Sequence, residues 1–189
     1  MLKQLKTSIL SVVILGIFAG LVFPLVITAI AQTAFPRQAN GSLIKRADGT
    51  VVGSELIAQG FTKPEYFHPR PSAAGNGYDA TSSGGTNLAQ SSKALVTRFQ
   101  GDIDKLAAQY PGKPVPIDLI TTSASGLDPD ITPDNASYQV PRIAKARNLS
   151  EEALHKLIAQ QITGRQFGVL GEPRVNVLML NLALDKLAR

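Results

Sequence analysis

The sequence predicts an α+β protein, with a single N-terminal transmembrane helix followed by one extracytoplasmic α+β domain. Three observations lead to this prediction. No charged side chain lies between Lys6 and Arg37. About 150 residues remain after that stretch, which suffices for one ordinary domain with its own core. Helical patterns in the remainder are interspersed with a few short strand patterns, and we find no internal repeat.

The first element is a membrane anchor. Residues 9–31 are almost wholly apolar, and about twenty such residues in a helix cross a hydrocarbon core of about 30 Å. We therefore expect a cytoplasmic terminus at 1–8, an anchor at 9–34 and a soluble domain at 35–189. Lys3 and Lys6 favour a cytoplasmic N-terminus, with the domain outside the plasma (cell inner) membrane.

A cleaved secretory signal is the competing interpretation of the same segment. Lys3 and Lys6 form a basic start, and Ala29-Ile30-Ala31 resembles a cleavage site. Signal cores run for about 7 to 15 residues, and this apolar run is longer. The length favours a retained anchor.

One side of the anchor has the composition of a helix-packing face. Gly16 and Gly20 stand four residues apart with Ala19 beside them, so another helix can approach closely. Glycine is also common in membrane helices that make no such contact. Pro24 removes a backbone hydrogen bond near Gly20, which predicts a kink and favours packing against a bundle.

The first half of the domain is predicted to contain a hairpin, a long loop and a helix. Asp48-Gly49 is a turn between short strands at 43–46 and 50–52. Proline, glycine and serine fill 64–87 and break regular structure. Asn87 is expected to cap a helix from 88 to about 109. Val115 to Thr122 alternates loosely, as in a strand.

The second half is predicted to be mostly helical. Thr132 precedes Pro133 as a helix N-cap, and the helix should break at Pro141. Ser150, followed by two glutamates, caps a helix to about residue 163. The apolar segment 175–187 predicts a buried last helix.

Composition narrows the classes of function. The net charge of +5 falls to about +3 without Lys3 and Lys6, and the remaining basic residues are scattered, which disfavours nucleic-acid binding. The sequence has no cysteine and two histidines, His68 and His155, so we expect no thiolate or histidine metal site. No bound metal is predicted, although a carboxylate-rich calcium site stays open.

Two loops have residue types that occur in catalytic or binding sites. His68 has Ser72 or Ser125 as a candidate nucleophile, with Asp79 or Asp128 to orient it, but no nucleophile-elbow pattern surrounds either serine. A loop in which Phe67 and Tyr66 anchor the chain and Arg70 pairs with a carboxylate is the structural alternative.

The glycine-rich loop at 81–87 leads into the predicted helix, where free amides favour anions. It lacks the P-loop lysine, so a capped turn is the alternative. We expect Asp128 and Asp130 to cap a turn or to bind a hard cation. We expect Glu172 and Arg174 to form a local ion pair.

Taken in order, several motifs are distinctive. They are Phe67-His68-Pro69-Arg70-Pro71-Ser72, Tyr78-Asp79, Ser83-Gly84-Gly85-Thr86-Asn87-Leu88, Ser125-Gly126-Leu127-Asp128-Pro129, Tyr138-Gln139-Val140-Pro141-Arg142 and Leu170-Gly171-Glu172-Pro173-Arg174-Val175-Asn176. Over essentially the whole chain they resemble the C subunit of the Kdp potassium-transporting ATPase. Thr86, where serine is more usual, and Asp130, where many relatives carry histidine, depart from the pattern.

The resemblance implies an accessory subunit of a high-affinity, ATP-driven potassium uptake complex. Its partners would be a channel-like potassium-binding subunit, a P-type ATPase subunit and a small single-helix subunit. The family is described as a catalytic chaperone that raises the ATP affinity of the ATPase subunit. No firmly bound cofactor is expected, and ATP would be met through the complex. The Asp-Lys-Thr-Gly-Thr phosphorylation sequence is absent, so no catalytic residues are expected.

The motifs supply the candidate contacts to a partner or a nucleotide. These are Phe67, His68, Arg70, Ser83, Gly84, Gly85, Asn87, Asp128, Gln139, Arg142, Glu172 and Arg174. A membrane-anchored extracytoplasmic hydrolase or a nucleotide-binding module is the alternative function. An external domain conflicts with direct contact to cytoplasmic ATP, so action through the anchor helix or at the potassium entrance is expected instead.

Overall fold

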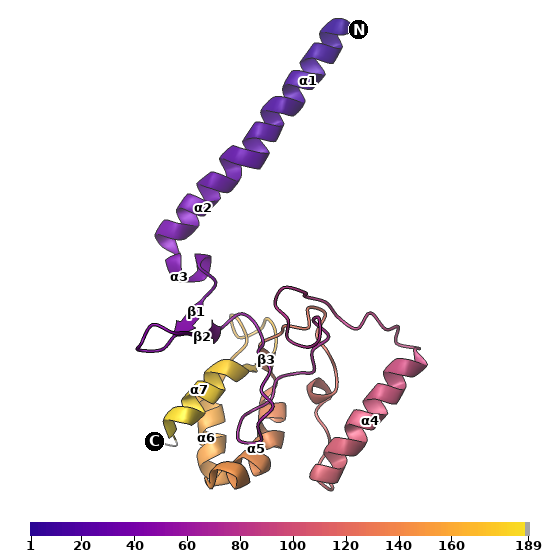
Figure 1. The fold of residues 1–189 in the computed structure, drawn as a ribbon, viewed down its shortest axis with the longest axis vertical. Coiled ribbons are helices and arrows are strands. Elements are labelled where there is room, and N and C mark those ends of the chain that lie inside the picture. Colours follow the sequence, from indigo (N-terminus) through magenta and orange to yellow (C-terminus); the bar gives the residue numbers. More distant parts are fainter. Residues whose placement is uncertain (188–189) are drawn as a thin grey trace. The chain divides into compact units, whose positions relative to one another are not determined.

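The computed structural model describes residues 1–187 and contains two compact units, Met1–Val52 and Gly53–Arg189. The first unit begins with one continuous helix, Leu2–Ala34, which is apolar enough to span a membrane. It comprises α1 (Leu2–Ile17), a π-helical turn η1 (Phe18–Val22) and α2 (Phe23–Ala34), drawn in indigo and purple in Figure 1. None of its residues is buried within the chain.

The π-helical turn explains how the helix continues past Pro24. Proline has no N–H to donate to the carbonyl of Gly20, so the regular ladder is interrupted there. The N–H of Phe23 instead donates to the carbonyl of Phe18, five residues back. Such wide turns absorb an interruption without ending a helix. The expected disturbance at Pro24 is thus a π turn inside an unbroken helix.

A short hairpin follows the helix. After α3 (Pro36–Ala39), strand β1 (Leu43–Lys45) pairs with β2 (Val51–Ser54), which confirms the predicted hairpin. The carboxylate of Asp48 accepts a hydrogen bond from the Thr50 N–H at 2.9 Å. Gly49 has φ of +83°, which glycine adopts at little cost.

The second unit is built on three helices, α5 (Pro133–Arg147), α6 (Glu151–Gln161) and α7 (Val177–Leu187), which gather together in Figure 1. Thr132 and Ser150 cap α5 and α6 as predicted, because each hydroxyl accepts from a backbone N–H three residues on. A small antiparallel sheet of β3 (Asp130–Ile131), β5 (Arg174–Asn176) and β4 (Ile162–Thr163) lies beside them, in the order β3-β5-β4.

The core of this unit is formed where α5, α6 and α7 meet β5. Its largest fully buried apolar side chains are Phe67, Val140, Ile143, Leu154, Val175, Leu180 and Leu184. Phe67 is the member contributed by the long loop, so that loop is anchored to the helices. The predicted burial of the last helix is confirmed, although its first two predicted residues form strand β5 instead.

The predicted helix at 88–109 is shorter than expected. Helix α4 is Lys93–Gln109, and Asn87 has φ of +53°, a left-handed conformation that does not suit an N-cap. Figure 1 shows α4 apart from the three core helices. Its apolar stripe, which includes Leu95 and Phe99, is only partly buried.

Two further predictions are wrong. Residues 115–122 form no strand but a 3-10 turn at Ile117–Leu119, which follows Pro116 and its fixed φ. Helix α5 runs straight through Pro141 rather than breaking there. Val140 and Ile143 on either side are fully buried, and this packing outweighs the single hydrogen bond lost at proline.

Candidate functional site

Two buried amides fasten the loop that carries Phe67 and His68. The Asn181 side chain accepts from the Phe67 N–H at 2.8 Å and donates to its carbonyl at 2.9 Å. The Gln139 side chain does the same for His68, at 2.8 and 3.0 Å. Each amide therefore pairs with the backbone as a neighbouring β-strand would. We call these two side chains the amide clamp.

Two arginines of α5 hold residues 64–66, which directly precede Phe67. Arg142 donates to the carbonyls of Pro64 and Tyr66 and, at 2.6 Å, to the side-chain oxygen of Gln139. Arg147 lies over the Tyr66 ring at 4.7 Å and pairs with Asp185 at 2.7 Å. Its Nε also donates to the carbonyl of Glu65. The backbone carbonyls of a segment without regular structure thus find donors on α5.

The surroundings of His68 disfavour its charged form. Its Nε2 lies 2.9 Å from the Lys63 carbonyl and 3.4 Å from Nη1 of Arg142. Burial lowers the pKa of His68 below 6.5, and the Arg142 charge adds to this, while the Lys63 bond opposes it. Burial also lowers the pKa of Arg142.

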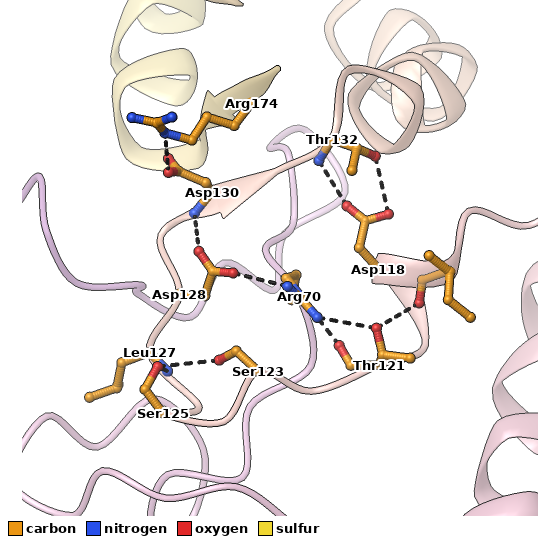
Figure 2. Close-up of polar contacts among 11 residues, drawn as sticks. Arg70, Asp118, Thr121, Ser123, Ser125, Leu127, Asp128, Asp130, Thr132 and Arg174 are labelled. Carbon is orange, nitrogen blue, oxygen red and sulfur yellow. Dashed lines mark hydrogen bonds and ion pairs between the residues drawn. The ribbon is translucent and has the colours of Figure 1, made fainter. Parts of the chain in front are cut away.

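A chain of ion pairs joins the same loop to the segment before α5 and to the sheet (Figure 2). Arg70 donates to Asp128 at 3.0 Å, and Asp128 accepts from the Asp130 N–H at 3.1 Å. Asp130 in turn pairs with Arg174 at 3.0 Å. Arg70 also donates to the Thr121 hydroxyl at 3.2 Å. These contacts connect loop 64–87, loop 120–130 and β5, which are distant in sequence.

The carboxylates around this chain differ in environment. Asp118 is buried and accepts from the N–H and hydroxyl of Thr132 at 2.8 and 3.2 Å (Figure 2). Burial raises the pKa of Asp130, Arg174 opposes this, and the nearby Asp128 charge adds to it. Asp128 and Asp130, which the sequence predicted as turn caps or cation ligands, each pair with an arginine: Asp128 with Arg70, and Asp130 with Arg174.

The residues proposed for a hydrolase do not come together as a catalytic set. The Ser72 hydroxyl donates to the Gly126 carbonyl at 2.6 Å, and Asp79 accepts from Thr81. His68 makes its contacts with Lys63 and Arg142 instead. The arrangement matches the structural alternative, in which Phe67 anchors the loop and Arg70 pairs with a carboxylate.

The glycine-rich loop lies against the loop around Ser125. Ser83 and Gly84 both donate to the Ser125 carbonyl, at 3.0 and 2.9 Å. A Cβ at Gly85 would come within 3.1 Å of the Ala124 carbonyl oxygen, so only glycine fits without a shift. Since α4 begins at Lys93, the helix start that motivated an anion site at Leu88 is absent, and the Gly84 amide has a protein partner.

The remaining candidates lie on other elements. Glu172 pairs with Arg165 and Arg174 pairs with Asp130, so the predicted pair between Glu172 and Arg174 is not formed. On the anchor, a Cβ added at Gly16 would meet no atom within 4 Å outside the local helix backbone, and the same holds at Gly20, which lies in the π turn. Ala19 is exposed beside them, and Pro24 follows the turn.

Sequence reasoning missed several residues that hold the site together. These residues are Asn181, Asp118 and Arg147. The exposed Phe167 was also missed, although it takes no part in holding the site together. Asn181 sits between Leu180 and Leu182 in an apolar helix, a signal of a buried polar contact. Nothing in the sequence around Asp118 or Arg147 points to their partners.

The described residues define a class of protein: one helix that is apolar enough to span a membrane, followed by an α+β domain in which Arg70, Asp128, Asp130 and Arg174 are paired with one another. Comparison with known proteins specifies the family. The family described as "K+-transporting ATPase, c chain" (KdpC) matches residues 5–186. The chain belongs to the KdpC family of potassium-transporting ATPase subunits.

Several relatives match nearly their whole length. The potassium-transporting ATPase KdpC subunit of Acidobacterium capsulatum is 58% identical over 98% of this chain and 100% of that protein. The subunit of Koribacter versatilis is 55% identical over 98% and 95% of the two chains. That of Bradyrhizobium diazoefficiens is 52% identical over 100% and 99%. The resemblance drawn from the ordered motifs is thereby confirmed.

Proposed function

We propose that this chain is a non-catalytic subunit that stabilises an ATP-driven potassium uptake complex in the plasma (cell inner) membrane. The observation that carries the proposal is the helix Leu2–Ala34, of which no residue is buried inside the chain. An apolar helix of this length needs lipid or other helices around it. Its partners are a channel-like potassium-binding subunit, a P-type ATPase subunit and a small single-helix subunit.

One helix has too little surface to shield an ion from lipid, so the transport path belongs to those partners. The chain contributes binding surfaces: the Gly16/Gly20 side of its anchor and the outside of its domain. The paired state of Arg70, Asp128, Asp130 and Arg174 supports a structural rather than a catalytic role for the domain.

The decisive experiment is co-purification of the full chain with the transporter subunits in detergent. Gly16→Leu combined with Gly20→Leu should reduce recovery of the chain, because leucine blocks close helix approach. Neither glycine has a neighbour within 4 Å, so the change leaves the chain's own contacts intact. Ser11→Leu is the matched control, since about 100° per residue places it about 140° from Gly16 within α1, before the π turn. Equal recovery of all three proteins would remove the role given to this face.

The domain is proposed to lie outside the cytoplasm. This follows from Lys3 and Lys6, which favour a cytoplasmic N-terminus, and from a single span. Reporter enzymes fused after Arg189 test it. An extracytoplasmic reporter should be active and a cytoplasmic one silent; the reverse result would overturn the orientation and reopen direct contact with ATP.

We also propose that any effect on ATP affinity is indirect and passes through the partner subunits. The amide of Gly84, a candidate phosphate ligand, already donates to Ser125. Calorimetry of the full chain in detergent should therefore detect no binding of ATP tighter than millimolar. Micromolar binding by the chain alone would contradict this and favour a nucleotide-binding module.

A further inference from the structure

We propose that the hairpin between β4 and β5 docks Phe167 into an apolar pocket on an extracytoplasmic surface of a partner subunit. This inference rests on the proposed function, because it requires a partner complex and an external domain. We call residues 165–172 the Phe167 hairpin. Nothing in the amide clamp or the ion-pair chain involves its tip.

The hairpin is ordered by its own backbone. Gln166 and Leu170 exchange two hydrogen bonds, at 2.8 and 2.9 Å, and the Val169 N–H donates to the Gln166 carbonyl at 3.2 Å. Residues 167–169 connect this pair, and the first two of them, Phe167 and Gly168, have φ of +53° and +77°. At its base, Arg165 pairs with Glu172.

Phe167 is an unusual residue for this position in two respects. Its side chain is 92% exposed, with Val169 at 71% and Leu170 at 57% beside it. A bulky side chain at positive φ is also strained, and glycine or asparagine is the residue usually found in that conformation. The ring thus neither packs in its own domain nor suits its own turn. Such strain at a projecting apolar side chain is typical of binding segments.

The chemistry of the tip favours a protein pocket over a lipid surface. Membrane-binding segments usually combine apolar side chains with free basic residues, but Arg165 is neutralised by Glu172. A hairpin backbone that is fixed by its own hydrogen bonds suits a shaped socket, since preorganisation lowers the entropy cost of docking.

The test is Phe167→Asn in the full chain. Asparagine suits positive φ and precedes Gly168, so the turn is retained or strengthened while the ring is removed. We expect the thermal stability of the domain to be unchanged or higher. Dissociation from the immobilised transporter in detergent should be at least about tenfold faster, as for a central aromatic anchor.

Val96→Asn is the matched control. Val96 is 58% exposed on α4, and valine and asparagine have similar helix propensities. It should dissociate like the wild type. If Phe167→Asn also dissociates at the wild-type rate, the docking role is wrong while the proposed function stands. If the wild-type chain itself is not retained by the transporter, the proposed function fails and the docking role with it.

A tryptophan at the tip distinguishes protein from lipid. The sequence contains no tryptophan, so Phe167→Trp creates the single tryptophan of the chain. Its emission should shift to the blue when the partner subunits are added, because the ring leaves water. Vesicles of brominated phosphatidylcholine should not quench it. Strong quenching by these vesicles in the assembled complex would show insertion into lipid and would overturn the pocket.

Discussion

Replacing Asn181 by leucine should release the long loop from the helical core. Leucine has a similar size but cannot bond to the N–H and carbonyl of Phe67, a residue with no exposed surface. Leaving a buried backbone group unpaired costs about 1–3 kcal/mol, hence about 2–6 kcal/mol for both. The added apolar surface of leucine returns about 1 kcal/mol. We expect a net loss of about 3 kcal/mol of unfolding free energy.

Urea unfolding of the full chain in detergent measures this loss. All four tyrosines lie in the second unit, so their fluorescence reports on the domain and not on the anchor. With a slope of about 1–3 kcal/mol per molar urea, the midpoint should fall by about 1–3 M. Gln160→Leu, an exposed amide on α6, is the control and should stay within about 0.5 kcal/mol of wild type. If Asn181→Leu behaves like this control, the clamp does not hold the loop.

Two further predictions use the same assay. The folded-state pKa of His68 is below its unfolded value of 6.5, so its contribution to stability is complete above pH 6.5 and is lost on acidification. His68→Asn should therefore reduce the fall of the urea midpoint between pH 7.5 and 5.5. An identical fall in the variant and the wild type would exclude His68 as the source of the pH dependence. Thr132→Ala should lower the free energy of unfolding by about 2 kcal/mol and Ser150→Ala by about 1 kcal/mol, because the Thr132 hydroxyl caps α5 and also donates to Asp118. Equal losses in the two variants would mean that the bond to Asp118 adds no stability.

Sequence rules predicted an element correctly where the contacts that determine its structure lie close together in the sequence. The anchor follows from a long uncharged run, the β1–β2 hairpin from Asp48-Gly49, and the starts of α5 and α6 from Thr132 and Ser150. Each of these depends on a few neighbouring residues. The same rules misplaced the start of α4, because the capping ability of Asn87 says nothing about its actual positive φ.

Elements that depend on tertiary contacts were harder to predict. Helix α5 continues through Pro141 because Val140 and Ile143 are buried against other helices, which no local pattern reveals. The candidate site shows the same division. Arg70 pairs with a carboxylate as expected, whereas the pairing of Arg174 with Asp130 depends on the contact of β5 with β3, which is distant in sequence.

The π turn at residues 18–22 has a consequence for how the anchor meets its surroundings. A π turn amounts to one inserted residue, and one residue corresponds to about 100° of rotation. A stripe of side chains that begins on α1 therefore does not continue along the same side of α2. The two halves of the span face different directions, so one helix can lie in contact with two separate neighbours at different depths of the bilayer.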